Sequence, residues 1–263
     1  MLRLSPELTT KYPSIPAEAV CDAIELAAIK TVTTCLGISA TACVDEDGFL
    51  HVHLLKEGKQ EELQIAGLKR NIKRRLLDEV ELELMKRQAW HEARKFNTIR
   101  GSAVAGTIDR IREDGTLVVL IELIDLLTPI VLYAECPVAQ QPVPERGRYQ
   151  KGDVMDFFVS SCTAISNSRH AKVRIIVSRT ARELPSRLLM KLTGLPGIRC
   201  IKRIPGGESR IITPHWIPNK AIVTVGQQLR EHLSVEFQGH TQAKKENQHA
   251  PIQQNPRRSA GGR

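Results

Sequence analysis

The stretch Ile201-Lys202-Arg203-Ile204-Pro205-Gly206-Gly207-Glu208-Ser209-Arg210-Ile211-Ile212 determines how the last third of this chain folds. Its two ends are strand-like, and Pro205-Gly206-Gly207 between them is typical of a turn, because proline presets φ and glycine tolerates positive φ. Helical spacing precedes and follows this hairpin. The predicted elements are a helix over Leu184–Leu192, strands over Ile198–Ile204 and Arg210–Thr213, a helix over Ala221–Leu233 and a strand over Val235–Phe237. Residues 181–240 therefore predict a small mixed α/β unit.

Residues 98–180 have the pattern of an all-β unit. Turn residues such as Glu113-Asp114-Gly115 separate short apolar runs, and a proline-broken loop, Pro137–Arg148, precedes the fourth run. The predicted strands are Val104–Ile111, Thr116–Ile124, Ile130–Tyr133, Val154–Ser160 and Lys172–Val177. Five strands with this spacing favour a closed Greek-key barrel of the OB type.

Residues 1–97 predict an α+β head. A helix is expected over residues 16–36, with Pro16 suited to its first turn and Gly37 to its C-terminal end. Two strands follow, Ala40–Val44 and Phe49–Leu55, around an Asp- and Gly-containing turn. A long helix is expected over residues 63–96, because one apolar stripe advances by four residues at a time. The members of that stripe are Leu68, Ile72, Leu76, Val80 and Leu84. The whole chain is thus predicted to be an α+β protein of several domains.

Positive charge is concentrated in the C-terminal third. The chain carries a net charge of +9, with 38 Lys and Arg against 29 Asp and Glu. Residues 1–97 and 98–180 are nearly neutral, at −1 and +1, whereas residues 181–240 carry +5 and residues 241–263 carry +4. Such a balance favours a polyanionic partner. Residues 241–263 hold few apolar side chains, so they are predicted to be a disordered basic tail.

Several classes of protein are not expected. The six cysteines show no Cys-X-X-Cys spacing and no apolar run is long enough to span a membrane, so we expect reduced thiols, a cytoplasmic location and no membrane association. His51 and His53 point the same way along a strand, but no further ligands are evident, so neither a metal nor a cofactor is expected. No thiol stands at a spacing that suggests a neighbouring catalytic base, so the chain is not expected to be an enzyme.

The order of several short motifs resembles the NusA family of bacterial transcription elongation and termination factors. Gly101–Ile108 is similar to the opening strand of the S-one type RNA-binding barrel of that family. Val143-Pro144-Glu145, followed by Tyr149-Gln150-Lys151-Gly152-Asp153, resembles its proline-glutamate, aromatic and glycine-aspartate run. Ser178-Arg179-Thr180 resembles the signature that leads from the barrel into a KH domain, and Ile201–Ile212 resembles the first KH strand pair. The resemblance covers about residues 16–237.

The resemblance implies a role in transcription by binding and not by catalysis. It implies that the head, residues 1–97, docks on bacterial RNA polymerase near the RNA exit channel. The S-one type barrel, residues 98–180, and the KH-like domain, residues 181–240, would contact nascent single-stranded RNA and modulate pausing, termination or antitermination. Other elongation or antitermination factors are implied as further partners. Two alternatives stay open: an RNA-binding module that acts on mRNA or ribosomes without polymerase, and a protein-interaction adaptor whose RNA surface has decayed.

One departure from the family concerns the GxxG loop with which a KH domain grips RNA through close backbone approach. The matching place is Pro218–Gln227, where only Gly226 could represent one of the two glycines. Val223 and Val225 occupy positions that glycine would have left open. Gripping by this loop is therefore not expected, and RNA affinity is expected to be weak.

Three groups of residues are candidates for contact with RNA or polymerase. RNA contact is predicted around the C-terminal hairpin, for Lys202, Arg203, Arg210 and Lys220, and at the end of the barrel, for Arg169, His170, Lys172 and Arg174. Contact with polymerase or RNA is predicted for the basic run of the long helix, Lys69, Arg70, Lys73, Arg74 and Arg75. The alternative for this run is a solvated face paired with Asp78, Glu79, Glu81 and Glu83 at i,i+4 spacing. Phe157, Phe158 and Tyr133 could stack bases, but we expect them to pack in the core.

Overall fold

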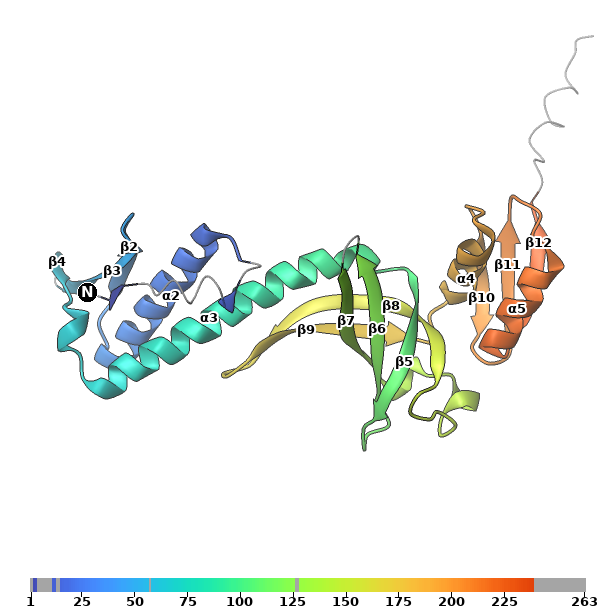
Figure 1. Cartoon of the computed structure of the whole chain (residues 1–263), viewed down its shortest axis with the longest axis horizontal. Coiled ribbons are helices and arrows are strands. Elements are labelled where there is room, and N and C mark those ends of the chain that lie inside the picture. The colour runs from blue at the N-terminus through green and yellow to red at the C-terminus, as the bar shows by residue number, and fades with distance from the viewer. Residues whose placement is uncertain (1, 4–10, 13–14, 57, 126–127, 239–263) are drawn as a thin grey trace, which may run out of the picture. The chain divides into compact units, whose positions relative to one another are not determined.

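The chain forms two compact units, Met1–Leu184 and a second that begins at Pro185. The computed structural model describes residues 2–3, 11–12, 15–56, 58–125 and 128–238 (Figure 1), and the predicted basic tail, residues 241–263, lies outside them. Helices and three sheets alternate along the chain, so the predicted α+β class is confirmed. The finer division at residues 97, 180 and 240 stays a prediction.

The head is a small sheet covered by two helices. Strand β3 lies between β2 on one edge and β1 and β4 on the other. The elements are β1 Leu2–Arg3, α2 Ala17–Leu36, β2 Ala40–Val44, β3 Phe49–Lys56, β4 Lys59–Glu62, a 3-10 turn Ile65–Gly67 and α3 Arg70–Phe96. Helix α2 ends at Gly37, whose φ of 67° is left-handed, as the sequence predicted. Strand β4 was missed because all four of its side chains are exposed and show no apolar alternation.

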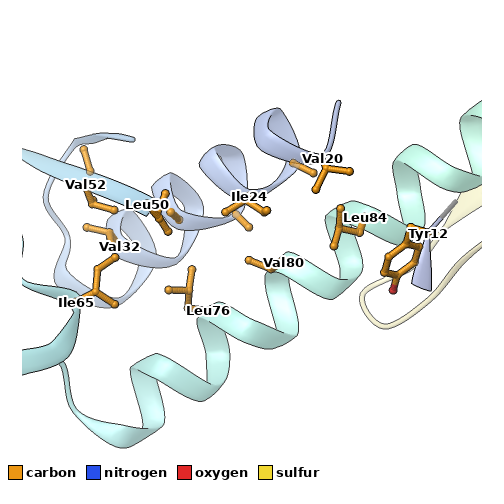
Figure 2. Packing of buried hydrophobic residues seen from close by; sticks show 14 of the residues in the cluster. Tyr12, Val20, Ile24, Val32, Leu50, Val52, Ile65, Leu76, Val80 and Leu84 are labelled. Carbon is orange, nitrogen blue, oxygen red and sulfur yellow. The ribbon is translucent and has the colours of Figure 1, made fainter. Parts of the chain in front are cut away.

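Helix α3 begins seven residues later than predicted. The stripe that starts at Leu68 suggested a helix from residue 63, but Leu68 and Lys69 are extended, with ψ near 148° and 147°. From Arg70 onward the stripe does face the head: Leu76, Val80 and Leu84 pack against α2 and β3 (Figure 2). Removing a side chain such as the fully buried Leu84 would cost about 2–5 kcal/mol of stability.

The barrel is closed by five strands in the order β5-β6-β7-β9-β8, with β7 and β9 parallel and the other pairs antiparallel. Its elements are a 3-10 turn Asn97–Ile99, β5 Ala103–Ile111, β6 Leu117–Asp125, β7 Thr128–Cys136, 3-10 turns Val138–Gln140 and Val143–Glu145, β8 Val154–Ser166 and β9 Ala171–Ser178. All five predicted strands are present. Strand β8 runs six residues further than predicted, because its exposed end pairs with β9 instead of forming a loop.

The last turn of α3 contributes to the barrel core. Phe96 packs with the buried side chains of the strands, among them Phe157. Gly106 of β5 allows a close approach in this core, because a Cβ there would lie 2.4 Å from Cγ1 of Val119. One helix therefore supplies side chains to two cores, and the head and barrel share it.

A buried ion pair ties the proline-broken loop to the end of the barrel. The Arg179 guanidinium donates to both carboxylate oxygens of Glu145, from Nη2 at 2.6 Å and from Nε at 3.1 Å. Its Nη1 donates to the Asp156 carbonyl at 2.9 Å, and the Tyr149 hydroxyl donates to Glu145 at 2.7 Å. Burial alone would lower the pKa of Arg179, but the bonds to Glu145 outweigh it and raise the pKa. The motif residues Glu145, Tyr149 and Arg179 thus form one cluster.

The second unit is a three-stranded sheet with two helices. Its elements are α4 Leu184–Thr193, β10 Arg199–Ile204, β11 Glu208–Thr213, α5 Asn219–Leu229 and β12 His232–Phe237. Strand β11 is central, antiparallel to β10 and parallel to β12. The helix predicted to reach Leu233 ends at Leu229, because Arg230 takes a left-handed φ of 55°. Strand β12 accordingly begins three residues earlier than the predicted Val235.

We expect Arg179→Met to destabilise the protein by about 3–5 kcal/mol, because it leaves the Glu145 carboxylate buried without its partner. Urea unfolding measures this loss. Arg174→Met is the matched control: Arg174 lies on β9, whereas Arg179 directly follows it, and Arg174 also pairs with a carboxylate. Its side chain is 45% exposed, so a loss of at most about 1 kcal/mol is expected. Equal losses in the two variants would contradict a special role for the buried pair.

Candidate nucleic-acid interface

The first cation surface lies at the start of α3 and is called the α3 cluster: Lys69, Arg70, Lys73, Arg74 and Arg75. All but the half-buried Lys73 are exposed, and Lys73 donates to the Ala66 carbonyl at 2.7 Å. No ion pair involves these five side chains within the described ranges. The acidic side chains expected to pair with them are used elsewhere or unpaired: Glu81 binds Lys11, and Glu83 binds Lys30 and Lys86. The predicted i,i+4 pairing is therefore not found.

The α3 cluster works against the dipole of its own helix. The N-terminal end of a helix carries partial positive charge, so cations there are unfavourable and carboxylates are favourable. Helix α3 has no acidic residue in its first turn and begins at Arg70, directly after Lys69. The field of the backbone and the field of the side chains therefore add, and this end of the helix attracts anionic surfaces.

The second cation surface lies on the outside of the barrel and is centred on Glu135 of β7. The Glu135 carboxylate accepts from Arg112 Nη2 at 2.7 Å and from Arg174 Nε at 2.8 Å. Burial alone would raise the pKa of Glu135, but the bonds from these two arginines outweigh it and lower the pKa. Glu135 is thus held ionised and fixes both guanidinium groups on the surface.

Tyr133 lies on the same outer face as this cluster. Alternate residues of a strand share a face, so Tyr133 and Glu135 point the same way along β7, as Lys172 and Arg174 do along β9. The predicted core position of Tyr133 is wrong, because its side chain is 60% exposed. Phe157 is fully buried, as predicted, and Phe158 is half-buried. An exposed aromatic ring beside two cations is the arrangement that stacks a base and binds its phosphate. We call Tyr133, Lys172, Arg174 and Arg112 the barrel face.

Arg169 and His170 stand at the tip of the β8–β9 hairpin. The Asn167 side-chain oxygen accepts from the backbone N–H of Arg169 at 2.9 Å and of His170 at 2.7 Å, which fixes the turn. Both side chains are exposed, as is Lys172 further along β9. The structure therefore brings these three predicted residues and Arg174 onto one hairpin.

The four residues predicted in the second unit do not form one surface. Lys202 and Arg210 are directly opposite each other on β10 and β11, and they line a hollow of about 200 Å³ with His232. Lys220 lies on α5. A Cβ on Gly226 of α5 would touch the Leu233 side chain at 3.7 Å, so α5 covers the face of the sheet that carries Leu233. Lys202 and Arg210 belong to the opposite face, which separates them from Lys220.

Arg203 is removed from the candidate interface. Its side chain is 2% exposed, and its guanidinium binds the buried Glu231 carboxylate through Nη2 at 2.7 Å and Nε at 3.1 Å. The same carboxylate accepts from the Gly206 N–H at 3.0 Å and the Ser209 hydroxyl at 2.7 Å. Arg203 therefore holds the hairpin to the start of β12. The basic pair Lys202-Arg203 suggested surface charge, but the partner of Arg203 is 28 residues away in sequence.

The stretch that matches the GxxG loop lies almost wholly within helix α5. Residues 219–229 form one helix, and Gly226 lies inside it. A Cβ at Gly226 would stand 2.9 Å from the Glu231 carbonyl, so this glycine serves packing between α5 and the following strand. In the described part of this unit no loop between two consecutive helices is present.

Two residues of the candidate surfaces were missed from sequence. Arg112 follows a strand and precedes a turn, where its partner on β7 could not be foreseen. Trp216 is 74% exposed between β11 and α5. Its exposure could have been predicted from sequence, because Trp216 lies between two prolines and outside every predicted helix and strand. It therefore belongs to no apolar stripe that faces a core.

His51 of the head is held by two carboxylates. Its Nε2 lies 3.0 Å from Asp45 and its Nδ1 lies 3.2 Å from Glu62. Among the described residues no group of three or more His, Cys, Asp or Glu side chains is placed to hold a metal ion.

Comparison of the chain with protein-family models gave no match. Comparison with curated proteins also gave none. None of the helices in the described ranges has the length and apolar character needed to cross a membrane. The candidate interface therefore has to be assigned from its own residues and contacts.

We expect Arg70→Glu to raise the free energy of unfolding by about 0.3–1 kcal/mol, because it places a carboxylate at the positive end of α3. Urea unfolding of the whole chain measures the change. The same change of charge at the other end of the helix, Arg94→Glu, should lower stability instead, because Arg94 lies in the last turn, where the helix dipole favours a cation. A stability loss in Arg70→Glu would mean that Arg70 has a structural partner and that the dipole argument is wrong.

We expect the contribution of His51 to stability to fall as pH rises. Hydrogen bonds that the protonated ring donates to Asp45 and then to Glu62 raise the pKa of His51, so the fold favours its protonated form. That contribution is complete below the unfolded pKa of about 6.5 and is lost as pH rises through the raised pKa. The difference in melting temperature between the natural chain and His51→Gln should therefore shrink from about pH 5.5 to about pH 8.5. A difference that stays constant or grows over this pH range would contradict the stabilising role of the protonated His51.

Proposed function

We propose that this protein is a NusA-like, cytoplasmic transcription factor that binds bacterial RNA polymerase through its head and nascent single-stranded RNA through its barrel and second unit. In this role it modulates pausing, termination or antitermination by binding alone. The α3 cluster is the polymerase contact, and the barrel face is the main RNA contact. Other elongation or antitermination factors would join the same complex.

The observation that carries the proposal is the convergence of separate motifs. Glu145, Tyr149 and Arg179 are among the residues on which the resemblance rests, and Glu145 and Arg179 are 34 residues apart in sequence. They meet in one buried hydrogen-bonded cluster, which supports reading them as parts of a single signature and not as chance matches. Ser178 adds to it by accepting from the backbone N–H of Thr180 and Ala181, both at 3.0 Å, where the chain leaves the barrel.

The strand order of the barrel supports an OB-type assignment. Counted along the chain, the first, second and third strands are neighbours, and the fifth lies between the third and the fourth. OB folds bind oligonucleotides on the face of the second and third strands and in the loops that join strands one to two and four to five. Tyr133 lies on the third strand, Arg112 follows the first, and Arg169 and His170 lie in the last of these loops. These positions support the proposed RNA contact.

The second unit supports a KH-like assignment only in part. Its order of helix, hairpin, helix and strand agrees with the prediction, but it has one helix where the GxxG loop would separate two. Without that loop the backbone offers no close grip on phosphates. Weak RNA affinity is compatible with the role, because attachment to polymerase raises the local concentration of the RNA-binding surfaces.

We expect Tyr133→Ala in the full chain to weaken binding of an unstructured ribo-oligonucleotide by about 5- to 150-fold, because a base stack on an aromatic ring contributes about 1–3 kcal/mol. It should leave binding to purified bacterial core RNA polymerase unchanged. Arg70→Glu combined with Arg74→Glu should do the reverse and abolish polymerase binding. Fluorescence anisotropy measures the first interaction and co-purification the second.

The alternatives make different predictions in the same experiment. A polymerase-independent RNA-binding module would bind the oligonucleotide through Tyr133 but fail to bind polymerase in any variant. An adaptor with a decayed RNA surface would show no RNA affinity at moderate salt, with or without Tyr133. Val131→Ala is a matched control for Tyr133, because Val131 is also exposed on β7 but offers no ring for stacking.

A further inference from the structure

The second unit contains a groove in which Lys220 is the only residue of the predicted RNA contacts. It lies between the end of α4, the loop before α5 and the first turns of α5, and its volume is about 530 Å³. This volume is within the range of about 300–1,000 Å³ that is usual for small-ligand sites. Its lining is mainly apolar, with Leu192, Leu195, Trp216 and Pro218 beside Lys220 and Thr224.

Trp216 is held in its exposed position by both of its neighbours in the chain. On one side Thr213 is buried, its hydroxyl donates to the His215 carbonyl at 2.8 Å, and it accepts from the His215 N–H at 3.1 Å. On the other side Ile217 is buried, and α5 begins at Asn219. The indole is therefore presented by an anchored loop, and its 74% exposure is not the result of a slack segment.

The charge around this groove selects a polyanion. No carboxylate lines it. The three acidic side chains that the structure describes after Pro185 are already paired: Glu208 with Lys202, Glu231 with Arg203 and Glu236 with Arg210. Among the described residues no ion pair involves Lys220, Arg187 or Arg199. The field is therefore positive, and Lys220 is the cation within the groove.

An unpaired nucleotide has the two properties that this groove requires. Its base is flat and stacks on aromatic side chains, and its phosphate is anionic. An apolar peptide would fill the groove but would leave Lys220 without an anion. Aromatic residues are 4% of this chain, so an exposed indole beside a lysine is a selective signal.

We propose that the groove binds one unstacked base of single-stranded RNA on Trp216, with the adjoining phosphate on Lys220. This inference rests on the proposed RNA-binding function and adds a second contact that is separate from the barrel face. In the second unit, RNA would be held by a base stacked on the Trp216 side chain instead of by the close backbone approach of a GxxG loop. Because every base has a flat aromatic face that can stack on an indole, the contact has little sequence preference.

The chain has two tryptophans, so Trp90→Phe leaves Trp216 as the sole indole reporter in the full-length protein. We expect a short unstructured ribo-oligonucleotide to quench its fluorescence saturably at low salt. Lys220→Gln removes the cation but keeps the indole. It should therefore weaken RNA binding, while saturating RNA still quenches the Trp216 fluorescence. In the complementary variant, Trp216→Leu, the apolar lining persists but the stack is lost, and RNA affinity should fall by about 5- to 150-fold.

Three results would overturn the inference, and they can be told apart from failure of the proposed function. RNA binding that depends on Tyr133 but leaves the Trp216 emission unchanged would refute the groove contact and keep the function. Quenching by an acidic amphipathic peptide but not by RNA would make this a protein-docking groove. Loss of all RNA binding in the natural chain would refute both. Arg230→Gln, which removes an exposed cation outside the groove, is the control for a general loss of charge.

Discussion

The buried guanidinium of Arg179 is the constraint on which the barrel end depends. An ionised side chain that is 1% exposed is tolerated only when a partner and hydrogen bonds replace its water. Glu145 supplies the partner from the proline-broken loop. The Arg179 side chain also donates to the Asp156 carbonyl of β8, and its backbone N–H donates to the Gln140 carbonyl at 2.8 Å. Arg179 thereby connects β8, the 3-10 turn at the start of the loop and the later part of the loop. The pair therefore fixes the loop against the end of the barrel. The first part of the loop is held separately, because the Gln141 side-chain amide donates to the carbonyls of Gly115 at 3.0 Å and Cys136 at 2.9 Å.

Helix α3 imposes the second constraint, because it serves two cores with two different parts of its length. Its stripe of Leu76, Val80 and Leu84 belongs to the head, and Phe96 belongs to the barrel. A helix committed in this way cannot shift to relieve the charge repulsion at its start. The α3 cluster is therefore kept in place at some cost to stability, as is common for residues that are retained for binding.

The elements with a regular apolar period were predictable from sequence, and the exceptions have local causes. Helix α2 and all five barrel strands were found because burial on one face leaves a pattern of period 3.6 or 2. The start of α3 was misplaced because Leu68 continues the stripe without being helical. The end of α5 was misplaced because Arg230 takes a backbone conformation that usually marks glycine. Of the site residues, Lys172, Arg174 and Lys220 could be proposed from charge alone. Arg203 could not be told apart from them, because burial depends on a partner that lies far away in sequence.

The distribution of the candidate surfaces explains how a protein without a gripping loop could still hold RNA. The barrel face and the Trp216 groove each offer one aromatic ring and a few cations, which is a weak site by itself. When weak sites are carried by one chain, the second contact forms at an effective concentration set by the chain and not by the solution, so the combined affinity exceeds either one. In the proposed role, a polymerase contact through the α3 cluster would add a third point of attachment to the same complex. Selectivity would then come from which RNA emerges beside the polymerase, and not from base-specific hydrogen bonds. The proposed role thus agrees with two surfaces that are positive and aromatic, and with a second unit whose described part has one helix where a GxxG loop would separate two.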